Sequence, residues 1–172
     1  HNAWVTQAGE KMSKSLGNTM VVEEVLKRIR GIELRWYLVA AHYRSNIEFS
    51  DDALQESGAA FRRIENFVVR ATERVGDVDP TSVPMCADFV IAMDDDLSAP
   101  SAVAAIHATV TEGNNLLAQG AKVELADLRG VLASVRRMLG VLGCDPLAPQ
   151  WVSNAGGSDE PHDVVDALVR IE

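Results

Sequence analysis

Two lysines and two serines stand close together near the start of the chain, in the segment GEKMSKSLGN from Gly9 to Asn18. Lys11 and Lys14 each bring a positive charge and three N–H donors, and the hydroxyl groups of the interleaved serines can donate as well. Such donors suit a polyanion, and the flanking glycines allow the backbone to move and to approach it. The pattern therefore predicts a site for a ligand such as a triphosphate.

Composition limits what else the chain can do. It has 172 residues, of which 47% are hydrophobic and 24% charged, and its net charge is −9. The apolar content is typical of a folded protein, and the negative charge argues against a broad nucleic-acid-binding surface because phosphate contacts need Lys and Arg. A local contact with nucleic acid is still compatible with this net charge. We find neither a run of apolar residues long enough to cross a membrane nor a secretory leader, so we expect a cytoplasmic protein without a membrane partner.

Metal-binding patterns are weak in this sequence. Cys86 and Cys144 lie far apart without neighbouring ligands, so we expect two buried free thiols rather than a disulfide or a zinc site. The run Asp94-Asp95-Asp96 could suggest a site for a hard cation. Because it directly precedes Leu-Ser-Ala-Pro and a new helical segment, capping and solvated loop residues are the favoured interpretation. No metal site is predicted.

Hydrophobic spacing predicts a mainly α fold, a helical bundle preceded by a short strand and the lysine–serine loop. Trp4 and Trp36 are expected in the core, and Gly31 is expected to close the first helix. The helices are predicted at about 21–30, 32–43, 50–75, 85–93, 101–118 and 123–142. We expect three parts: residues 1–49 with the loop and connecting helices, 50–145 as the helical bundle, and 146–172 as a Pro- and Gly-rich linker with the start of a further helix.

With these elements in place, KMSKSLGN resembles the signature loop of the class I aminoacyl-tRNA synthetases. Three further stretches resemble the cysteinyl-tRNA synthetases within that class: LRWYLVAAHYRSNIEFSDDAL at 34–54, FVIAMDDDLSAP at 89–100 and RRMLGVLG at 136–143. The matches occur in the family's order and with its approximate spacings. Leu97, Ser98 and Ala99 depart from the family's usual Phe-Asn-Thr, which bears on local packing. The resemblance covers roughly residues 1–150 and only the C-terminal part of such an enzyme.

The resemblance implies a ligase of protein biosynthesis that uses ATP with Mg²⁺ to activate cysteine and then loads it onto tRNA(Cys). It implies catalytic roles for Lys14 and Lys11, which would bind ATP together with Met12, Ser13 and Ser15. It also implies tRNA contacts in the region of Arg35, His42, Tyr43 and Arg44, although the His-Tyr-Arg stretch could equally cap a helix C-terminus. The family's HIGH motif and zinc-bound cysteine pocket would precede His1. We therefore expect this chain alone to be inactive and to lack the zinc ligands.

Two other functions fit parts of the same pattern. A homologous ligase that joins cysteine to an amino sugar would share the loop and the bundle. A non-catalytic helical module that binds RNA or protein would need neither the ATP site nor the missing half. The long basic helix, the Leu-Gly-Asn after the loop and the helix begun beyond the linker favour the synthetase.

Overall fold

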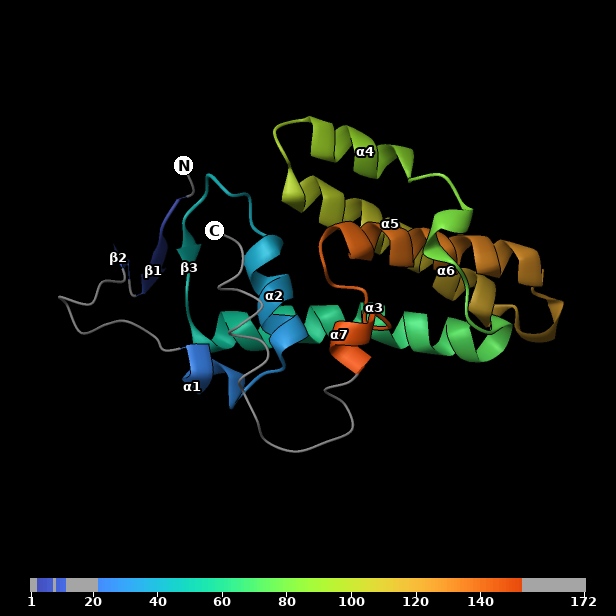
Figure 1. Ribbon diagram of the computed structural model, residues 1–172, viewed down its shortest axis with the longest axis horizontal. Helices are drawn as coiled ribbons and strands as arrows, with labels where there is room; N and C mark the ends of the chain where they lie inside the picture. The colour runs from blue at the N-terminus through green and yellow to red at the C-terminus, as the bar shows by residue number, and fades with distance from the viewer. Residues whose placement is uncertain (1–2, 8, 12–21, 153–172) are drawn as a thin grey trace.

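The computed structural model describes residues 3–7, 9–11 and 22–152, and helices dominate it. Figure 1 shows a small sheet at one end and a bundle of longer helices at the other. The mainly α fold predicted from the sequence is confirmed. The helices are α1 (Val22–Leu26), α2 (Gly31–Val39), α3 (Asp51–Val75), α4 (Ala87–Asp94), α5 (Ala99–Ala118), α6 (Leu125–Val141) and α7 (Pro149–Val152). No helix in these described residues is long and apolar enough to cross a membrane.

The sheet consists of three very short strands, β1 (Val5–Gln7), β2 (Glu10–Lys11) and β3 (Ile47–Glu48), in the order β2-β1-β3. β1 and β2 form an antiparallel hairpin in which Gln7 pairs with Glu10. β3 joins the other edge of β1 in parallel, and Thr6 pairs with Glu48. A segment that follows α2 in sequence thus lies beside the hairpin that leads into the lysine–serine stretch (Figure 1).

The helix α3 forms the base of the bundle. Its N-terminus is capped by Ser50, whose hydroxyl oxygen accepts a hydrogen bond from the Ala53 N–H at 3.1 Å, and Asp51 and Asp52 favour the first turn through the helix dipole. It ends at Gly76, whose φ of 75° suits glycine. One face is apolar throughout, which is why the predicted bounds agree closely with the observed ones.

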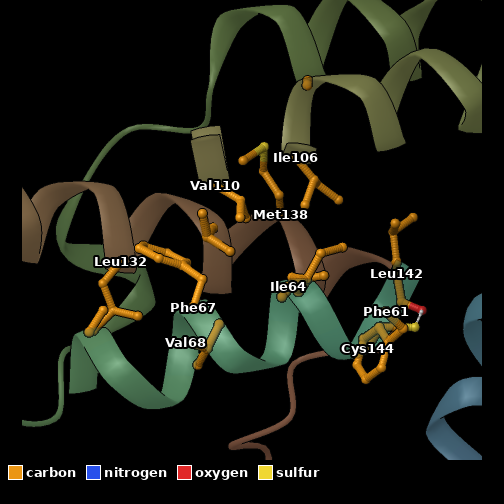
Figure 2. Packing of buried hydrophobic residues seen from close by; sticks show 14 of the residues in the cluster. Phe61, Ile64, Phe67, Val68, Ile106, Val110, Leu132, Met138, Leu142 and Cys144 are labelled. Atoms are coloured by element: carbon orange, nitrogen blue, oxygen red, sulfur yellow. Dashed lines mark hydrogen bonds between the residues drawn. The ribbon is translucent and has the colours of Figure 1, made fainter. Parts of the chain in front are cut away.

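The core lies where α2, α3, α4, α5 and α6 meet. Figure 2 shows Ile64 and Phe67 of α3 pointing toward Ile106, Val110 and Met138 of α5 and α6. Phe61, Val68 and Leu132 belong to the same buried cluster. Burial of each large apolar side chain contributes about 1.5–3 kcal/mol relative to exposure. A second, smaller cluster beside the sheet contains Val25, Ile29, Tyr37, Phe49 and Leu54. This second cluster supports the hairpin end of the molecule.

The buried guanidinium of Arg136 links the bundle to two loops. It contacts Asp77 at 2.6 Å and Asp145 at 3.1 Å, and it donates to the Val78 carbonyl oxygen at 2.9 Å. A buried charge is tolerated because its donors meet oxygen acceptors on several sides. The loop that follows α3 and the loop that follows α6 are thereby held together.

The helix α2 differs from its predicted form at both ends. Gly31 begins this helix instead of closing the previous one, because Arg30 is its N-cap and Glu33 accepts a hydrogen bond from the Arg30 N–H at 3.2 Å. Burial alone would raise the pKa of Glu33, but the hydrogen bonds from Arg30 and Arg62 lower it. The helix ends at Val39 rather than Tyr43, since the following backbone turns to meet the N-terminal segment, where the Ala3 N–H donates to the Tyr43 carbonyl oxygen.

The sequence predicts that two tryptophans and two cysteines are buried, and in each pair the prediction is right for one residue and wrong for the other. Trp36 is in the core with 2% of its surface exposed, but Trp4 is 55% exposed because β1 lies at the margin of the fold. Both cysteines are free, and Cys144 is buried while Cys86 is only half-buried. Burial raises the pKa of the Cys144 thiol to about 12.

Candidate functional site

The lysine–serine stretch begins at the end of the β1–β2 hairpin. Lys11 is the last residue of β2, while Met12, Ser13, Lys14 and Ser15 lie outside the described residues. The structure therefore places the start of the predicted ATP site and not the site itself. Gly9, with φ of 78°, allows the tight turn that connects β1 to β2.

The carboxylate of Glu48 holds this turn from the neighbouring strand β3. Its Oε2 accepts a hydrogen bond from the Thr6 hydroxyl at 2.5 Å, and its Oε1 accepts one from the Gly9 N–H at 3.1 Å. The backbone of Glu48 is supported in turn, because the Tyr37 hydroxyl donates to its carbonyl oxygen at 2.7 Å. Burial, together with the Glu48 charge, raises the pKa of Tyr37, which keeps that hydroxyl protonated as a donor. No motif or spacing in the sequence indicates this role of Glu48.

His42, Tyr43 and Arg44 form a stacked group after α2. The rings of His42 and Tyr43 are stacked with centroids 5.0 Å apart, and the Arg44 guanidinium carbon lies 5.3 Å from the Tyr43 centroid. The Arg44 side chain is 64% exposed. Aromatic faces and an exposed guanidinium can stack on bases and pair with phosphates, so this group has the chemistry for an RNA contact.

Asp96 fixes the His42–Tyr43–Arg44 group from the turn between α4 and α5. It accepts a hydrogen bond from the Tyr43 hydroxyl at 2.6 Å and pairs with Arg44 at 3.1 Å. Asp96 and Leu97 both have φ of 53°, which is an uncommon backbone conformation for residues other than glycine. Capping or solvation was the favoured interpretation for the three aspartates, and it missed this long-range contact of Asp96.

Arg35 lies apart from that group. Its Nε donates to the Leu142 carbonyl oxygen at 2.8 Å, at the C-terminal end of α6, and its guanidinium packs beside Gly143. The Trp151 indole N–H also meets this point, donating to the Gly143 carbonyl oxygen at 3.1 Å. Within the predicted segment 146–172, residues 149–152 form α7 and pack on the bundle, whereas residues 153–172 lie outside the described residues. The three-part division of the chain stays a prediction.

The part of the chain that the structure describes contains no candidate metal site. No group of three His, Cys, Asp or Glu side chains there could hold a metal ion. The Asp94–Asp96 run does not form one, since Asp96 faces Tyr43 and Arg44.

Two family models match the chain. Residues 1–59 match the "tRNA synthetases class I (C) catalytic domain", and residues 88–143 match the "DALR domain". The first match includes the lysine–serine stretch, Glu48 and the His42–Tyr43–Arg44 group. The second includes Asp96, so the contact between Asp96 and Arg44 joins the two matched segments.

Several curated proteins are similar to the chain over nearly its whole length. A "Cysteine–tRNA ligase" of Nocardioides sp. strain JS614 is 56% identical over 98% of this chain. Proteins of the same name from Streptomyces griseus and Streptomyces avermitilis are 52% and 53% identical over 99% of it. The chain spans about a third of the length of these curated relatives, covering 35% of the first and 36% of the other two.

A solved structure shares the fold at low sequence identity. It is described as the ternary complex of Agrobacterium radiobacter K84 agnB2 LeuRS-tRNA-LeuAMS, with a TM-score of 0.63 and 20% identity. The match covers 92% of this chain and 22% of that one.

Proposed function

We propose that this chain belongs to the cysteine–tRNA ligase family and is the part of such an enzyme that supplies the lysine–serine loop for cysteine activation and helices for tRNA binding. The observation that carries the proposal is the match at 52–56% identity over nearly the whole chain to proteins named cysteine–tRNA ligase. Those names favour tRNA ligation over ligation to an amino sugar. Because the relatives are about three times longer, the complete reaction is assigned to the full-length protein, and the isolated chain is expected to be inactive.

The proposed chemistry proceeds in two steps. The carboxylate of cysteine attacks the α-phosphorus of ATP, cysteinyl-adenylate forms, and pyrophosphate leaves. Mg²⁺ bound to ATP would neutralise part of the phosphate charge. Negative charge grows on the departing phosphate oxygens, and we assign its stabilisation to Lys14, assisted by Lys11. Met12, Ser13 and Ser15 complete the ATP-binding stretch. The terminal ribose hydroxyl of tRNA(Cys) then attacks the carbonyl carbon of cysteinyl-adenylate, so that the cysteinyl ester forms and AMP leaves.

Zinc is a second metal that the family resemblance implies. The described residues offer no suitable set of ligands, and the two cysteines are far apart in the sequence, with Cys144 buried and protonated. We assign zinc binding to the portion of the full-length protein outside this chain, and no step here depends on it.

The tRNA contact is assigned to the His42–Tyr43–Arg44 group. Its stacked rings and exposed guanidinium support the assignment, and Asp96 holds them in place from the DALR-matched segment. Arg35 is a weaker choice for tRNA because its Nε is already used by the Leu142 carbonyl oxygen. Since tRNA charging serves translation, the proposed location is the cytoplasm.

The test uses the full-length enzyme with Lys14→Ala. Loss of one charge-assisted contact in a desolvated site should slow adenylate formation about 30- to 1000-fold. Transfer from pre-formed adenylate to tRNA should change far less, because pyrophosphate has already left. Lys122→Ala, which removes an exposed charge after α5, is the matched control and should leave both steps unchanged.

Pre-steady-state rates of the two steps decide the outcome. Equal losses in both steps would show that Lys14 supports the fold in general. A loss confined to cysteine affinity would contradict the phosphate role.

A further inference from the structure

We propose that Glu48 is a positioning residue for the adenylation step, because it fixes the turn from which the lysine–serine stretch extends. The inference rests on the proposed function of that stretch. Glu48 is outside the predicted ATP-binding residues and acts through Thr6 and Gly9, not by touching a substrate.

One carboxylate bridges both ends of the hairpin turn. The Thr6 hydroxyl in β1 donates to Oε2 at 2.5 Å, and the Gly9 N–H, just before β2, donates to Oε1 at 3.1 Å. Both bonds are charge-assisted, and charge-assisted bonds are shorter and stronger than bonds between neutral groups. Glu48 therefore fixes the position of Gly9 relative to β1, two residues before Lys11.

The hairpin is very short. β2 contains only Glu10 and Lys11, and isolated two-stranded hairpins are marginal in water even when they are longer. A side chain that bridges the turn from a third strand therefore matters more here than it would in a broad sheet.

Glu48 itself is held firmly. On either side of it, the Ile47 N–H donates to the Trp4 carbonyl oxygen at 2.9 Å and the Phe49 N–H donates to the Thr6 carbonyl oxygen at 2.7 Å. The Tyr37 hydroxyl of α2 donates to the Glu48 carbonyl oxygen. The rings of Tyr37 and Phe49 pack edge to face, with their centroids 5.9 Å apart. The position of the turn is thus transmitted from the buried side of α2 through β3 to the base of the loop.

The experiment compares Glu48→Ala with Glu48→Gln in the full-length enzyme. Alanine removes both acceptors, so adenylate formation should slow roughly 10- to 100-fold, the scale expected for misplacement of a catalytic group by a distant change. Glutamine can still accept from Gly9 through its oxygen while its amide donates to the Thr6 oxygen, so it should restore the rate to within about threefold of the wild type. Asp52→Ala, at an exposed position in the first turn of α3, is the control and should leave the rate of adenylate formation unchanged.

The readouts separate positioning from general stability. For Glu48→Ala, the KM for cysteine and the transfer from pre-formed adenylate to tRNA should stay unchanged. Adenylation at the wild-type rate, or an equal loss in both steps, would overturn the inference. If Glu48→Ala does not fold, Thr6→Val carries the test. It removes one of the two bonds and should slow adenylation by a smaller factor, and a wild-type rate would refute the role.

Comparison with Lys14→Ala distinguishes the inference from the function on which it rests. If Lys14→Ala slows adenylation and Glu48→Ala does not, only the positioning role fails. If neither change slows adenylation, the proposed function of the lysine–serine stretch fails as well.

Discussion

Replacement of Gly143 by alanine should destabilise the chain through two separable effects. Gly143 has φ of 68°, and this left-handed conformation costs an L-residue about 1–2 kcal/mol. A Cβ there would lie 2.5 Å from both Nε and a terminal nitrogen of Arg35, whose Nε is committed to the Leu142 carbonyl oxygen. Relief of such overpacking typically costs a further 1–3 kcal/mol or so. We expect Gly143→Ala to lower the free energy of unfolding by about 2–5 kcal/mol in total.

A double-mutant cycle with Arg35→Ala separates the two effects. Without the guanidinium the clash is absent, so Gly143→Ala should cost only the backbone strain of about 1–2 kcal/mol. Gly120→Ala is a matched control, because Gly120 has φ of 59° and open space where a Cβ would be. It should show the backbone strain alone in the wild-type chain. The assay is urea unfolding followed by the fluorescence of Trp36 and Trp151. An equal cost of Gly143→Ala with and without Arg35 would refute this account of the packing.

Two further predictions test the bundle and the tRNA contact. Gly113→Ala should lower the free energy of unfolding, measured by urea unfolding, by about 1–3 kcal/mol, because its Cβ would lie 2.3 Å from the Phe67 ring. Gly130→Ala is the control: a Cβ there meets open space, and the free energy of unfolding should rise by up to about 1 kcal/mol. Arg44→Ala in the full-length enzyme should weaken tRNA binding and reduce the salt slope of log K by about 1, measured by titration at several salt concentrations, while Lys122→Ala should not. A slope unchanged by Arg44→Ala would contradict the phosphate contact.

Local patterns in the sequence were enough to predict the long helices. The apolar spacing of α3 and its Ser50 cap are both properties of neighbouring residues, and both predictions agree with the structure. The family resemblance rested on short strings in order, and the comparisons confirm it. The chemistry assigned to Lys14 came from the same strings and stays a prediction.

Contacts between distant segments could not be predicted in the same way. Gly31 fits a helix C-terminus by its type, yet Glu33 caps the next helix at that point. Asp96 and Arg44 are more than 50 positions apart, and no local pattern around either residue indicates that they pair. The role of Glu48 could not be predicted for the same reason, because its partners depend on a parallel strand pairing.

The segment that carries the loop contacts the bundle beyond α3 as well as at α3 itself. Arg35, within α2, bonds to the end of α6, and Arg44, beyond the end of α2, bonds to Asp96 in the turn between α4 and α5. Together with the packing of Ile32 and Trp36 in the core, these contacts hold α2 in one direction relative to the bundle. The base of the loop depends on that direction, because Tyr37 of α2 supports Glu48 and Glu48 holds the hairpin. The same helix thus sets both the position of the proposed tRNA contact and the start of the proposed ATP site, so the described structure supplies a direct physical connection between them.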